Sequence, residues 1–116
     1  MEGKTEEVLI ERGTEDVFHD LGLPNADELL AKSKLARAIS EAIKERKISQ
    51  SQLARLTGID QPKISQLMHG RISGFSSDRL MHILTKLDQD VIIFIRPKPV
   101  TDSRPASVTV DVVHAM

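Results

Sequence analysis

The chain has 116 residues, of which 40% are hydrophobic and 28% charged, a composition typical of one ordinary globular domain. It contains no cysteine and only 3% aromatic residues, which excludes disulfides and thiol catalysis and argues against single-strand binding by base stacking. The longest apolar run, Val91–Ile95, is far shorter than the roughly 20 residues that span a bilayer, and residues 2–7 hold three glutamates where a secretory signal would be basic. We therefore expect a cytoplasmic protein without membrane association.

The net charge of −1 conceals an uneven distribution along the chain. Residues 1–28 carry nine acids and two bases, residues 29–71 carry nine bases and three acids, and residues 72–116 carry five of each. A basic middle on an otherwise acidic chain is the electrostatic pattern of a nucleic-acid binder. A salt-bridged helical surface would give the same charges, so charge alone leaves both interpretations open.

The N-terminal part divides into an acidic arm and a first helix. Residues 1–24 are acidic and interrupted by glycine and proline, which predicts an arm, with a short strand at Val8–Ile10 as one option. Asn25 and Glu28 form a capping-box pattern, and apolar residues keep a helical period from Ala26 to about Arg46. This stretch is either one helix or two shorter helices that meet at Ser33.

A short helix is predicted to begin after Ser49. Gln52 completes a second capping box with Ser49, and Ile48 and Leu53 form a hydrophobic staple around this cap. The helix must be short because Gly58 ends it.

A second short helix follows at once. Asp60 is predicted to cap it, and Pro62 lies in the first turn, where a missing N–H has little cost. Ile64 and Leu67 are spaced to face inward, and Gly70 closes the helix.

The C-terminal part begins with one more helix. Phe75 and Leu80 form a staple around Ser76, so we expect a helix that runs to about Leu87. The β-branched and aromatic segment Val91–Ile95 then predicts a strand.

The two short helices and their glycine-containing turn describe a helix-turn-helix, although a generic helical hairpin is the alternative. We expect a mainly α fold, a helix bundle containing the helix-turn-helix, with a short C-terminal β element. The expected parts are an arm at 1–24, a DNA-binding domain at 25–90, and a strand and tail at 91–116. The residues predicted to form the helix-turn-helix core are Leu53, Ala54, Gly58, Ile59, Ile64 and Leu67.

Residues 49–70, SQSQLARLTGIDQPKISQLMHG, resemble the Cro and phage-repressor type of helix-turn-helix, also called the XRE family. The resemblance covers roughly residues 33–88, and it implies the lambda-repressor-like, five-helix domain of that family. A narrower likeness, carried by Val17–Pro24, Ala26–Ala31 and Ile95–Pro97, is to HigA-like antitoxins. Members of that subgroup are commonly encoded beside a HigB/RelE-like ribonuclease toxin.

In the family the second helix enters the major groove of DNA. The resemblance therefore implies that the base-contacting residues are those on the outer face of this helix, namely Gln61, Pro62, Lys63, Ser65, Gln66 and His69. Polar and basic residues that flank the helix are predicted to contact phosphates. For each lysine or arginine among them, a solvated surface position is the alternative. These residues are Arg46, Lys47, Ser49, Gln50, Gln52, Arg55 and Arg71.

No catalytic site emerges from the sequence. The four histidines have no metal-ligand spacing, and no nucleophile lies in a catalytic motif. We therefore predict a protein that is not an enzyme and has no metal site or cofactor.

The expected function is sequence-specific binding of a palindromic operator in double-stranded DNA, and the expected regulator is a repressor. The alternative is a protein-binding module that neutralises a ribonuclease toxin with little DNA-binding role, and the acidic arm favours such a basic partner. An antitoxin that represses its own operon would combine both roles.

We also expect a homodimer, because one helix-turn-helix reads only a few base pairs. The predicted contact is the strand Val91–Ile95, through Val91, Ile93 and Ile95. Pairing within the chain, with Val108–Val112 or Val8–Ile10, is the alternative and would leave a monomer.

Overall fold

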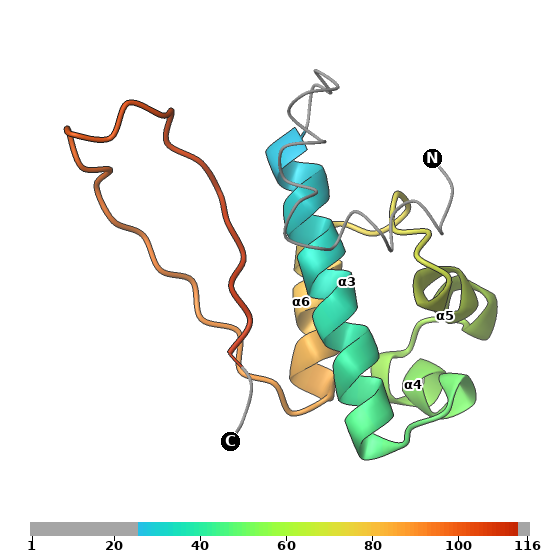
Figure 1. Cartoon of the computed structure of the whole chain (residues 1–116). Helices are drawn as coiled ribbons and strands as arrows, with labels where there is room; N and C mark the ends of the chain where they lie inside the picture. Colours follow the sequence, from blue (N-terminus) through green and yellow to red (C-terminus); the bar gives the residue numbers. More distant parts are fainter. Residues whose placement is uncertain (1–25, 114–116) are drawn as a thin grey trace.

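The computed structural model describes residues 26–113, and these residues form a helical body followed by a long C-terminal loop (Figure 1). The predicted arm at 1–24 and its Val8–Ile10 strand, the Asn25 cap and the end of the tail lie outside the described residues. Residues 26–113 form the helices α3 (Ala26–Arg46), α4 (Gln50–Thr57), α5 (Gln61–Met68) and α6 (Ser77–Lys86).

The first helix, α3, runs without a break through Ser33, so the option of two shorter helices is wrong. Ser33 is almost completely buried, because its small side chain fits the packed face of the helix. Residues 33–88 consequently contain four helices, and the expectation of five is corrected. No helix among residues 26–113 is long and apolar enough to cross a membrane.

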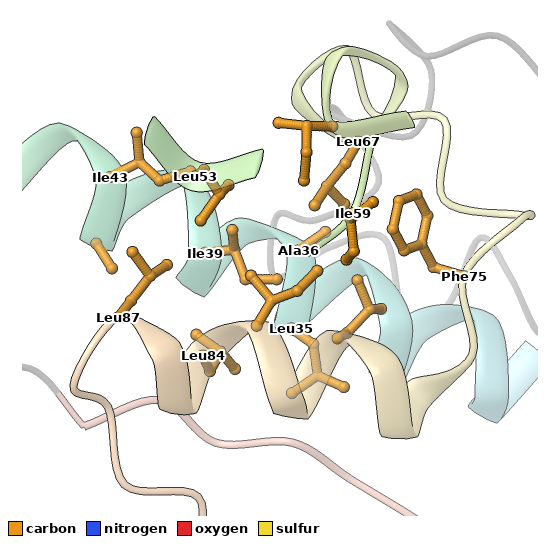
Figure 2. Close-up of a cluster of buried hydrophobic side chains, with 14 of the residues drawn as sticks. Leu35, Ala36, Ile39, Ile43, Leu53, Ile59, Leu67, Phe75, Leu84 and Leu87 are labelled. Atoms are coloured by element: carbon orange, nitrogen blue, oxygen red, sulfur yellow. The ribbon is translucent and has the colours of Figure 1, made fainter. Parts of the chain in front are cut away.

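The core lies between α3 and α6, which run side by side, and the pair α4 and α5, which covers one end and one side of them (Figure 1). Figure 2 shows side chains from all four helices and from the loops meeting in one cluster. Ile39 of α3, Leu53 of α4 and Phe75 of the α5–α6 loop are at most 1% exposed at its centre. This shared core fixes the positions of α4 and α5 relative to the body of the protein.

The predicted C-terminal β element is not present, because no strand forms among residues 26–113. Val91 and Val110 pack against the core, and the chain between them projects from the body on the side away from α4 and α5 (Figure 1). A strand requires a hydrogen-bonded neighbour, and neither Val91–Ile95 nor Val108–Val112 has one among the described residues 26–113. The β-branched composition of this segment therefore predicts an extended backbone, but it does not predict whether a neighbouring strand is present. We call residues 91–110 the C-terminal loop.

Candidate nucleic-acid interface

The start of α4 is held by the predicted capping box. The Gln52 backbone N–H donates to Ser49 Oγ at 3.1 Å, and the Ser49 N–H donates to Gln52 Oε1 at 2.8 Å. Ile48 is half-buried against the core and Leu53 is buried, as the predicted staple requires. The cap therefore places Ser49 and Gln52 together at the exposed N-terminus of α4.

The turn between α4 and α5 depends on Gly58. Its φ of 75° is in the left-handed region, and its N–H donates to the Ala54 carbonyl at 2.9 Å. Thr57 Oγ1 donates to the Leu53 carbonyl at 2.8 Å and accepts from the Ile59 N–H at 3.3 Å. These bonds fix the direction in which the chain enters α5.

Asp60 occupies the N-cap position of α5, but its side chain makes no capping hydrogen bond, which corrects the predicted cap. The Asp60 backbone carbonyl instead accepts from Lys63 and Ile64, both at 3.1 Å. Pro62, in the first turn, has no N–H, so this helix start has fewer donors to satisfy. The carboxylate is left exposed beside the interface.

The end of α5 is a Schellman motif around Gly70, whose φ is 79°. The Gly70 N–H donates to Leu67 at 3.0 Å, and the Arg71 N–H donates to Gln66 at 2.9 Å. His69 Nδ1 lies 2.7 Å from the Ser65 carbonyl oxygen, which restricts the imidazole to the last turn of the helix. The helix thus ends at a defined residue with its histidine held in place.

The two faces of α5 differ sharply. Ile64 and Leu67 are at most 3% exposed and join α5 to the core. The predicted base-contacting residues Gln61, Pro62, Gln66 and His69 are exposed, and Ser65 is half-buried. The sixth, Lys63, is half-buried and lies elsewhere, with Nζ 5.8 Å from the centre of the Phe75 ring. The structure therefore brings five of the six side chains to an accessible surface and turns Lys63 toward the α5–α6 loop.

The predicted phosphate-contacting residues belong to the end of α3, to α4 and its cap, and to the turn after α5, and their settings differ. Most are exposed, and only Gln50 is half-buried; the exposed ones are Arg46, Lys47, Ser49, Gln52, Arg55 and Arg71. Arg46 has a partner within the chain, because its Nη1 lies 2.8 Å from Asp88 Oδ2. Within residues 26–113, no ion pair engages Lys47, Arg55 or Arg71, so their charges remain available to a ligand.

Sequence reasoning missed one basic residue close to α5. The Arg79 guanidinium carbon lies 5.4 Å from the centre of the Phe75 ring, the same ring that Lys63 approaches. Arg79 is in the first turn of α6, where its backbone N–H donates to Ser76 Oγ at 3.1 Å. The sequence shows a serine cap, Ser76, followed by a basic residue, Arg79. The contact that Arg79 and Lys63 make with the same ring depends on the tertiary packing of Phe75.

Comparisons with known proteins agree with this geometry. A family model described as a helix-turn-helix domain matches residues 17–96, which is most of the chain. A solved structure whose name assigns it to the XRE family of transcriptional regulators is 44% identical, with a TM-score of 0.68, and the match covers 79% of this chain and all of that one. No curated protein gives a significant match. The chain therefore belongs to the helix-turn-helix domain family, and within it to the XRE type.

Proposed function

We propose that this protein is a transcriptional regulator that binds duplex DNA in a sequence-specific manner, with α5 as its reading helix. The main support for this proposal is the exposed polar face of α5. This face points outward because Ile64 and Leu67 anchor the opposite face in the core. Gln61 and Gln66 offer the amide pairs that recognise adenine, and Ser65 can donate or accept. The family and its similarity to an XRE regulator support the same function.

Phosphate contacts by the flanking residues complete the proposed interface. Ser49 and Gln52 present the N-terminus of α4, where free N–H groups and the positive end of the helix dipole favour an anion. The side-chain NH₂ of Gln52 makes no hydrogen bond within residues 26–113, so it can donate to a phosphate while its Oε1 stays in the cap. Lys47, Arg55 and Arg71 add sequence-independent attraction.

Substitution of Gln66 tests whether α5 reads bases. On a duplex that the wild-type protein selects from random DNA, Gln66→Ala should weaken binding by about 1–3 kcal/mol, and on a scrambled duplex it should change little. Gln89→Ala, which removes an exposed amide after α6, is the matched control and should leave both affinities unchanged. Equal losses on the two duplexes for Gln66→Ala would show that Gln66 does not read sequence.

We propose further that the regulator acts as a homodimer joined through the C-terminal loop. Ile92, Ile93, Phe94 and Ile95 are 71–90% exposed, and their backbone has no strand partner within residues 26–113. Exposed apolar segments with unpaired backbone groups favour strand pairing with another chain. The same segment of a second copy satisfies both needs in a two-fold arrangement that suits a palindromic operator.

The finer proposal is that the protein is a HigA-like antitoxin that represses its own operon and also binds a basic ribonuclease toxin. Its support is the charge of residues 1–28, which carry nine acids and two bases. Because opposite charges attract, this acidic segment would attract a basic partner and accelerate its binding. A module that only neutralises a toxin is the alternative, and the exposed polar face of α5 favours the dual role.

Deletion of residues 1–24 separates the two activities. We expect the truncated chain to bind the selected duplex with wild-type affinity, because α4 and α5 are fixed by the core of residues 35–87. It should lose affinity for the basic ribonuclease proposed as its partner, as measured by titration calorimetry. A truncated chain that still binds the ribonuclease would remove the main support for the antitoxin role.

A further inference from the structure

Two cations share one aromatic ring at the boundary between α5 and α6. Lys63 Nζ lies 5.8 Å and the Arg79 guanidinium carbon 5.4 Å from the centre of the Phe75 ring. The ring is 1% exposed, so its position is set by the core rather than by the two cations. Cations at such distances are attracted to the face of an aromatic ring. Phe75 is therefore a contact that both positive charges share.

The neighbouring backbone leaves room for Lys63 to reach this position. A Cβ added at Gly74 would lie 3.6 Å from Lys63 Nζ, an ordinary van der Waals distance, so the ammonium group lies near the α5–α6 loop. To reach a base from here, Lys63 would have to leave both the ring and the loop. Gln66 and His69, by contrast, are exposed on the outer face of α5.

The two charges are not compensated within the described part of the chain. Neither Lys63 nor Arg79 forms an ion pair among residues 26–113, although Arg46 in the same domain is paired with Asp88. Both side chains are half-buried, which partly removes them from water while leaving an open side. Unpaired cations near a helix proposed to read DNA favour contact with an anion, and the anion nearest to such a helix is a phosphate of the DNA backbone.

We propose that Lys63 and Arg79, supported by Phe75, form a clamp for the DNA backbone, and that Lys63 sets the position of α5 in the groove without reading a base. This inference rests on the proposed function, because it assumes that α5 docks on duplex DNA. It assigns Lys63 a different role from the base contact that the family resemblance implies, and it adds Arg79 to the interface.

The test is Lys63→Met, which keeps an unbranched side chain on the Phe75 ring and removes the charge. Affinities are measured over a range of salt concentrations on the duplex selected by the wild-type protein and on a scrambled duplex. We expect both affinities to fall by the same factor, roughly three- to tenfold, so that their ratio is unchanged. The slope of log K against log salt should decrease in magnitude by about 0.9, the contribution of one phosphate contact.

Three further variants make the result specific. Arg79→Gln should reproduce the changes of Lys63→Met, and Lys63→Arg should retain the wild-type slope. Lys86→Met removes the same charge from the last turn of α6, away from Phe75, and should have a smaller effect on the slope than Lys63→Met.

A loss confined to the selected duplex, with an unchanged salt slope, would overturn the clamp and return Lys63 to the base-reading residues. Unchanged affinities on both duplexes would overturn the clamp while leaving the proposed function standing. A wild-type protein that binds both duplexes equally would overturn the sequence-specific function itself.

Discussion

Ile93→Lys should yield a monomeric protein that keeps its helices but loses tight binding to a full palindrome. Ile93 is 71% exposed in the single chain, so a lysine there does not disturb the helical core. In a paired strand, by contrast, it would place like charges close together across the two-fold axis. Because two linked half-sites gain affinity from effective concentration, their separation should weaken binding by a factor of about 10² to 10⁴. Sedimentation, circular dichroism and a binding titration measure the three properties.

The matched control for Ile93→Lys is Val100→Lys. Val100 lies in the turn of the same loop and is 99% exposed, so the variant adds the same charge outside the predicted pairing segment. It should remain dimeric and bind as the wild type does. The dimer proposal is wrong if the wild-type chain sediments as a monomer at micromolar concentration and binds a single half-site tightly.

Phe75→Ala should lower the free energy of unfolding by about 3–5 kcal/mol, the cost of removing a fully buried aromatic ring from a packed core. Phe75 is 1% exposed and lies in the cluster that joins the α5–α6 loop to the helices (Figure 2). Small domains have a total stability of roughly 5–15 kcal/mol, so this one change removes a large share of it. Denaturant titration followed by circular dichroism measures the effect.

Phe94→Ala provides the comparison at an exposed ring. Phe94 is 82% exposed, so at concentrations low enough to keep the chain monomeric its removal should change stability by less than about 0.5 kcal/mol. A loss below about 1 kcal/mol for Phe75→Ala would contradict the central packing role given to this ring.

Local sequence signals predicted the helix-turn-helix well. The capping box at Ser49 and the left-handed Gly58 depend on neighbouring residues only, and both are present with their hydrogen bonds. Asp60 is the exception within this motif. Its backbone carbonyl accepts from the Lys63 N–H, the donor that the carboxylate was expected to satisfy, and also from the Ile64 N–H in the ordinary first helical hydrogen bond. The residue type alone does not show whether the backbone carbonyl or the side chain will accept from the N–H groups of the first helical turn.

Features that depend on distant parts of the chain could not be predicted in the same way. The Arg46–Asp88 ion pair joins residues 42 positions apart, and the ring shared by Lys63 and Arg79 comes from a loop between two helices. The segment Val91–Ile95 forms no strand within residues 26–113 for a related reason, since the sequence shows a suitable segment but not whether another segment lies beside it. Tertiary or quaternary packing decides each of these cases.

Selection from a random pool of duplexes tests most directly whether α5 reads the sequence of duplex DNA. The full-length protein is incubated with the pool, and bound duplexes are recovered and sequenced over several rounds. We predict enrichment of one palindrome whose half-sites are about 34 Å apart, with Gln66→Ala changing the preferred bases inside each half-site. Recovery of duplexes without a common sequence, at a salt concentration where the protein still binds DNA, would contradict the account.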